Sequence, residues 1–132
     1  MERQLGRFAP QIYAVTRILA GIMFACHGAQ KLFGWPIPAS GEAPPFVVYV
    51  AGPIELVGGL MIAAGLYTSY AAFLASGLMA AAYFMAHASS GFWPIQNRGE
   101  LAILYCWYFL TLAAKGGGIW SADVAMGKKS ST

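Results

Sequence analysis

The sequence predicts an all-α fold: a four-helix bundle, integral to a membrane, in a single domain that spans residues 1–132. The first observation is composition, since 58% of the 132 residues are hydrophobic and only 10% are charged, whereas soluble domains are about 25% charged. A soluble domain of this size keeps much of its surface in water and has no interior large enough for so many apolar side chains. The second observation is the arrangement of the apolar residues in four long segments. We therefore expect the lipid bilayer to surround most of the chain.

The four helices are predicted at about residues 9–33, 46–66, 70–88 and 100–118. Loops rich in proline and glycine at 34–45 and 89–99 separate them, a short turn lies at 67–69, and three glycines at 116–118 end the fourth. At 1.5 Å per residue the first three segments reach roughly 30 Å, the thickness of the hydrocarbon core. The fourth is shorter, and it spans only if its last turns continue into the glycines or if it uses part of the preceding loop.

The distribution of lysine and arginine predicts the orientation of the bundle. Four spans bring both termini to one side, and most of the basic residues fall on that side: Arg3, Arg7, Lys115, Lys128 and Lys129. Only Lys31 and Arg98 fall on the other. Because short cytoplasmic flanks carry the excess of lysine and arginine, we expect both termini in the cytoplasm. The net charge of +3 forms no basic stripe, which excludes nucleic acid as a partner.

Polar residues inside apolar segments are the candidate functional residues, because a free charge at the bilayer centre costs about 2.5–3.5 kcal/mol on insertion scales. Arg17 of the first segment and Glu55 of the second both come out roughly 13 Å deep, counted from the start of each segment. We therefore predict an Arg17–Glu55 ion pair near the midplane. Such a pair either holds the bundle together or lines a ligand cavity, and the sequence leaves both interpretations open.

A second polar cluster is predicted at the opposite end of the bundle from the termini. It comprises His27, Gln30, Lys31, His87, Asn97 and Glu100, with Arg98 beside them. Lys31 and Glu100 are candidate partners because each lies near a helix end. Simpler structural roles are open as well, since Asn97 can shape the turn before the fourth segment and Glu100 suits the N-terminus of a helix.

The two histidines, His27 and His87, meet the loose condition for haem ligation, because they lie on different helices at similar depth. No spacing motif supports a haem or a metal site, and Cys26 and Cys106 form no CxxC pattern. Hydrogen bonding, or proton transfer near neutral pH, is the more common role of such histidines.

Several stretches resemble the DoxX family of membrane proteins. They are Arg17 followed by Gly21, HGAQKLFG at 27–34, PIELVGGLMIAAGLYT at 53–68, PIQNRGELAILY at 94–105 and the glycines at 116–118. The resemblance extends from about residue 11 to residue 124. It implies a four-helix protein of the bacterial inner membrane, and family members include subunits of a thiosulfate:quinone oxidoreductase and partners of oxidative-stress enzymes.

Three functions are consistent with the sequence. The first is a quinone-linked redox subunit, in which Arg17 or Lys31 polarises a carbonyl oxygen and His27 or Glu55 handles protons. No flavin or dinucleotide motif is present, so a protein partner would supply the electrons. The second is a non-catalytic membrane scaffold that recruits a soluble redox enzyme. The third is a transporter of protons or small solutes, which would need to form a homo-oligomer.

Overall fold

The computed structural model describes residues 1–128, and within that range every regular element is helical, as predicted. Lys129, which the charge pattern assigns to the cytoplasmic side, lies outside the described residues. The elements in chain order are α1 (Glu2–Leu5), η1 (Gly6–Phe8), α2 (Ala9–Phe33), η2 (Val47–Ala51), α3 (Gly52–Ala64), α4 (Thr68–Ala82), η3 (Tyr83–His87), η4 (Ala88–Ser90), α5 (Pro94–Asn97), α6 (Glu100–Lys115) and α7 (Ala122–Ala125).

Three continuous helical stretches in the described chain are long and apolar enough to cross a membrane. They are Glu2–Phe33 with 32 residues, Val47–Ala64 with 18 and Thr68–Ser90 with 23. Helix α6 has 16 residues and ends at Lys115, before the predicted limit at residue 118. Gly116 follows with φ 80° and ψ −168°, a conformation that stops the helix.

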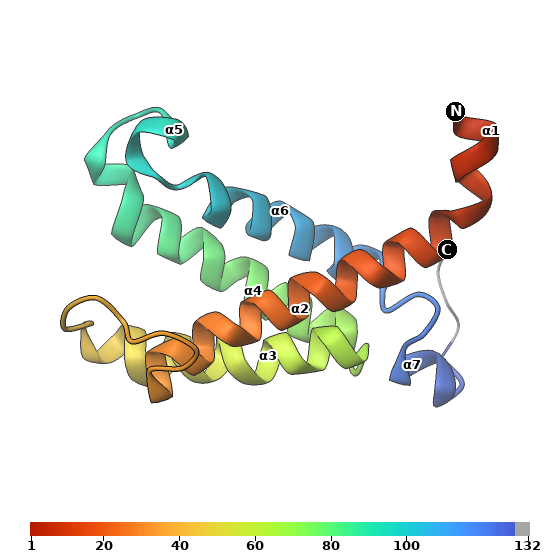
Figure 1. The fold of residues 1–132 in the computed structure, drawn as a ribbon, viewed down its shortest axis with the longest axis horizontal. Coiled ribbons are helices and arrows are strands. Elements are labelled where there is room, and N and C mark those ends of the chain that lie inside the picture. Colours follow the sequence, from red (N-terminus) through yellow and green to blue (C-terminus); the bar gives the residue numbers. More distant parts are fainter. Residues whose placement is uncertain (129–132) are drawn as a thin grey trace.

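The long helices form two pairs (Figure 1). Helix α3 packs mainly on α2, and α4 packs mainly on α6, while α3 and α4 share a smaller contact. Figure 1 also shows α1 and α7 at one end of the molecule, here called the α7 end, and α5 with the loop before η2 at the other, the α5 end.

Glycine brings α2 and α3 into direct backbone contact. A Cβ on Gly21 would lie 2.5 Å from the nitrogen of Ala63 and 2.7 Å from the oxygen of Gly59, and one on Gly28 would meet Leu56 and Gly52 in the same way. In lipid, apolar side chains gain no free energy from the hydrophobic effect when helices associate. Close backbone packing, which small residues allow, holds the helices together instead. By contrast, Gly58 would have no neighbour within 4 Å of its Cβ.

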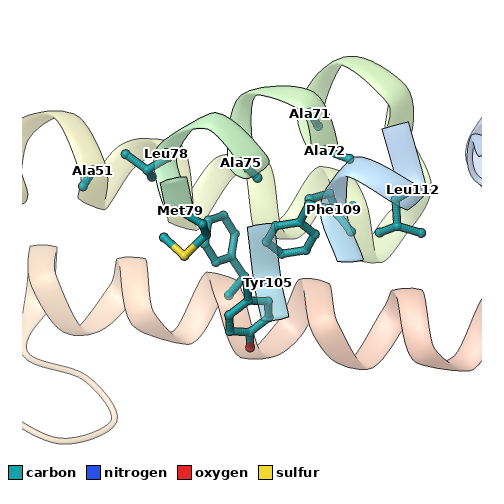
Figure 2. Close-up of a cluster of buried hydrophobic side chains, with 11 residues drawn as sticks. Ala51, Ala71, Ala72, Ala75, Leu78, Met79, Tyr105, Phe109 and Leu112 are labelled. Atoms are coloured by element: carbon teal, nitrogen blue, oxygen red, sulfur yellow. The ribbon is translucent and has the colours of Figure 1, made fainter. Parts of the chain in front are cut away.

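The core lies between the pairs. Ala71, Ala72 and Ala75 of α4 leave room for the aromatic side chains of α6, and Phe109 and Leu112 are fully buried among them (Figure 2). Phe24 of α2 reaches the same cluster, with its ring centroid 4.8 Å from that of Phe109. Aromatic packing therefore joins the α2–α3 pair to the α4–α6 pair.

The chain after α6 folds back over the α7 end of the bundle. The carboxylate of Asp123 accepts hydrogen bonds from the backbone N–H groups of Tyr67 and Thr68, both at 2.9 Å, and from the Thr68 hydroxyl at 2.8 Å. Lys128 adds an ion pair at 2.9 Å. Burial raises the pKa of Asp123, but these donors outweigh it and hold the pKa at about 2. Asp123 therefore caps the N-terminus of α4 as an anion. The positive end of the helix dipole at that position stabilises its negative charge.

The predicted Arg17–Glu55 ion pair is wrong. Arg17 is fully buried, and its guanidinium donates to the carbonyl oxygens of Ile62, Ala63 and Trp120 at 2.7, 2.6 and 2.7 Å. The prediction failed because it counted the depth of each residue from the start of its own helix. Helix α3 ends at the level of Arg17, so the first two turns of α2 extend beyond the end of α3. Arg17 is a cation at the C-terminus of α3, where the last carbonyls lack partners within the helix.

Candidate functional site

A cavity of about 340 Å³ lies at the α5 end, between the two helix pairs. Its polar lining residues come from every long helix: His27 and Lys31 of α2, Glu55 of α3, His87 of η3, Arg98 after α5 and Tyr105 of α6. The remaining wall is apolar, with Phe24 and Leu78 among its residues. The volume and the small set of converging polar groups are typical of a small-molecule site.

Lys31 and Glu55 form an ion pair in the wall of this cavity. Glu55 is only 3% exposed, while the side chain of Lys31 is 24% exposed. The predicted Lys31–Glu100 pair is therefore wrong, because Lys31 lies in the last turn of α2, opposite Glu55, and Glu100 is exposed at the start of α6. A buried carboxylate needs such a partner, because desolvation of an unpaired charge is costly. Lys31 lines the cavity although it is paired with Glu55.

His87 is held in one orientation by the loop that follows it. Its Nδ1 lies 3.0 Å from the backbone oxygen of Asn97. A carbonyl oxygen can only accept, so Nδ1 is the donor, and the neutral ring carries its remaining lone pair on Nε2. Tyr83 stacks against the imidazole at 6.5 Å between ring centroids. His87 can thus offer a hydrogen-bond acceptor, or a second donor when protonated.

The other predicted residues, Asn97, Gln30, Glu100 and Arg17, lie outside the cavity lining. The amide of Asn97 donates to the Tyr83 hydroxyl at 3.1 Å and to the Gly91 oxygen at 2.9 Å, and its oxygen accepts from Gly99 N at 2.8 Å. Asn97 therefore braces the α5 loop. Gln30 and Glu100 are absent from the cavity lining, and Arg17 lies toward the α7 end.

The sequence prediction missed two features of the site. Tyr105 and Phe24 form the inner boundary of the cavity, with ring centroids 5.8 Å apart. Aromatic residues in an apolar helix give no sign of which ones border a cavity. Arg98 belonged to the predicted cluster, but only the structure places it in the wall, as the residue with positive φ (60°) that ends α5.

The lining defines what the cavity can bind. With two fixed cations, Lys31 and Arg98, against one carboxylate, Glu55, it favours a ligand that presents hydrogen-bond acceptors or negative charge. In residues 1–128, no group of three or more His, Cys, Asp or Glu side chains is placed to hold a metal ion.

Comparison with known proteins identifies the family. The DoxX family profile matches residues 12–88, more than half of the chain. The chain belongs to the DoxX family. The resemblance found in the motifs around Arg17, His27 and Glu55 is thereby confirmed. An uncharacterized protein of Haemophilus influenzae is 40% identical over 131 residues, which cover 95% of this chain and 98% of the relative. No solved structure gives a significant match.

Proposed function

We propose that this DoxX protein is the quinone-binding membrane subunit of an oxidoreductase complex. The observation that carries the proposal is the cavity, in which an apolar chamber meets the Lys31–Glu55 pair, His87 and Arg98. A quinone has a flat apolar ring and two carbonyl oxygens that accept hydrogen bonds. The ring suits the boundary formed by Phe24 and Tyr105, because aromatic faces favour offset stacking.

The polar residues have roles that follow from their chemistry. Lys31 and Arg98 donate to carbonyl oxygens, and a cation there favours the build-up of negative charge on oxygen. A quinone becomes a quinol by taking up two electrons and two protons. His27 and His87 can deliver protons at the cavity wall. The electrons come from a partner protein, since the chain carries no flavin or dinucleotide motif.

The proposal includes four membrane spans with both termini in the cytoplasm of a bacterial inner membrane. Helix α6 supplies the fourth span: its 16 residues extend about 24 Å, and slight thinning of the bilayer accommodates the difference. Its exposed residues Leu101, Leu104, Trp107 and Leu110 form a lipid-compatible face. Arg3, Arg7, Lys115 and Lys128 then lie on the cytoplasmic side, with the cavity near the opposite surface.

Equilibrium binding of a tail-free benzoquinone to the protein in lipid nanodiscs tests the proposal. Lys31→Met together with Glu55→Gln removes both charges, so neither is left buried alone, and loss of one charged hydrogen bond should weaken binding about 10- to 150-fold. Glu100→Gln is the matched control, since Glu100 is exposed and outside the cavity. No quinone binding by the unaltered protein, together with co-purification of a redox enzyme, would instead support the non-catalytic scaffold.

A further inference from the structure

The two π-helical segments in the described chain both border the cavity. Segment η2 (Val47–Ala51) contributes Val47 and Ala51, and segment η3 (Tyr83–His87) contributes Met85, Ala86 and His87. A π-helical turn is rare, and where it interrupts an α-helix it is frequently associated with function. Here one such turn lies in each of two helices that bound the same side of one cavity.

The two lateral sides of the cavity differ in chemistry. Toward α2 and α6 the wall carries His27 and Tyr105, with Arg98 just before α6. Toward η2 and η3 it is formed by small or apolar residues except for His87 at the end of η3, with Val47 and Ala51 from one helix and Ala82 and Ala86 from the other. Helices α3 and α4 pack less closely than the helices within each pair. The side of the cavity lined by Val47, Ala51, Ala82 and Ala86 is here called the slot.

The slot opens onto apolar surface. Phe46 and Met85 line the cavity and are also 45% and 65% exposed. In a membrane protein such residues contact lipid, since the bilayer solvates apolar side chains. A molecule in the cavity can therefore direct its polar end to Lys31 and Arg98 and an apolar chain through the slot into the bilayer.

We infer that the slot between η2 and η3 is a lateral portal, through which a membrane-dissolved quinone enters and in which its hydrocarbon tail remains. This inference rests on the proposed function and adds the class of quinone: a long-tailed species taken from the lipid, not a water-soluble one. Ala82 and Ala86 set the width of the portal, since they are four residues apart and line the cavity together.

The test compares two probes with the same benzoquinone headgroup, one without a tail and one with a decyl chain, in nanodiscs. Ala82→Phe with Ala86→Phe fills the slot. The control is Gly77→Phe on the same helix, because Gly77 is exposed and a Cβ there has no neighbour within 4 Å. The filled slot should weaken binding of the decyl probe about 5- to 150-fold more than binding of the tail-free probe, the range expected when a packed site must accept extra volume.

Each outcome decides between the two ideas. If the filled variant binds both probes as tightly as the unaltered protein does, the portal is overturned and the proposed function is left intact. Absence of tail-free quinone binding by the unaltered protein overturns the proposed function and the portal with it. If the filled variant loses both probes, Val47→Phe narrows the slot from the opposite wall. Selective loss of the decyl probe there supports the portal, and any other result refutes it.

Discussion

Replacing Asp123 by asparagine should destabilise the protein in a pH-dependent way. The anion is held by three donors of Tyr67 and Thr68 and by Lys128, and its side chain is 11% exposed. These contacts hold its pKa at about 2, against an ordinary value of 3.8. Since one pKa unit corresponds to about 1.4 kcal/mol, the charge contributes roughly 2 kcal/mol to the free energy of unfolding. The asparagine side chain keeps one acceptor oxygen but loses that contribution.

The sign of the pH dependence follows from the lowered pKa. The contribution is complete above about pH 4 and is lost as the pH falls toward about 2, because in this range the unfolded state takes up a proton that the folded state does not. Unfolding by sodium dodecyl sulfate in mixed micelles, followed by circular dichroism, measures the difference at neutral pH and at several pH values between 4 and 2. Glu2→Gln, an exposed change on α1, is the control.

Two results would refute this reasoning. Equal stability of Asp123→Asn and the unaltered protein at neutral pH would mean that the segment after α6 does not cap α4. A loss of stability for the variant that persists unchanged at pH 2 would show that the effect comes from packing and not from the charge of Asp123.

Further predictions concern the helix pair and its charges. Gly21→Ala should destabilise the protein by about 1–3 kcal/mol, because its Cβ would collide with the backbone of α3, whereas Gly58→Ala should be neutral or slightly stabilising; unfolding in mixed micelles distinguishes them. A double-mutant cycle on Lys31→Met and Glu55→Gln should give a coupling energy of at least about 1 kcal/mol. The same cycle on Arg17→Met and Glu55→Gln should give less than about 0.5 kcal/mol, since Arg17 contacts α3 roughly 10 Å farther along the helix. A larger coupling energy between Arg17 and Glu55 would contradict the structure and support the ion pair that the sequence predicted.

The sequence was sufficient for the helical fold because apolar length and glycine or proline breaks act locally. Gly34 and Gly91 have positive φ and end the helical segments before them, as predicted for the breaks at 34–45 and 89–99. The second break is not wholly a loop, however, because Pro94 begins the short helix α5 inside it. Helix limits were less predictable where geometry decides, as at Gly116, which stops α6 before the glycine stretch ends.

The sequence was insufficient for the pairing of charges, because pairing depends on the relative heights of helices. Counting residues from each helix start placed Arg17 and Glu55 at the same depth, but α2 extends beyond α3 at the α7 end. Lys31 meets Glu55 only because the antiparallel register set at Gly28 brings their turns together. The cap formed by Asp123 was likewise missed, since the residue follows a glycine-rich turn whose path the sequence does not determine.

Photolabelling with a quinone that carries a photoreactive group on its ring tests the central claim most directly. After illumination in nanodiscs, mass spectrometry identifies the labelled residues. A quinone bound in the cavity should label residues of its wall, such as Met79, Met85 and Tyr105, and excess unlabelled quinone should suppress that labelling. Labelling confined to the lipid-facing side chains of α2 and α6, such as Leu19 and Leu104, and unaffected by competitor would contradict the proposed quinone site.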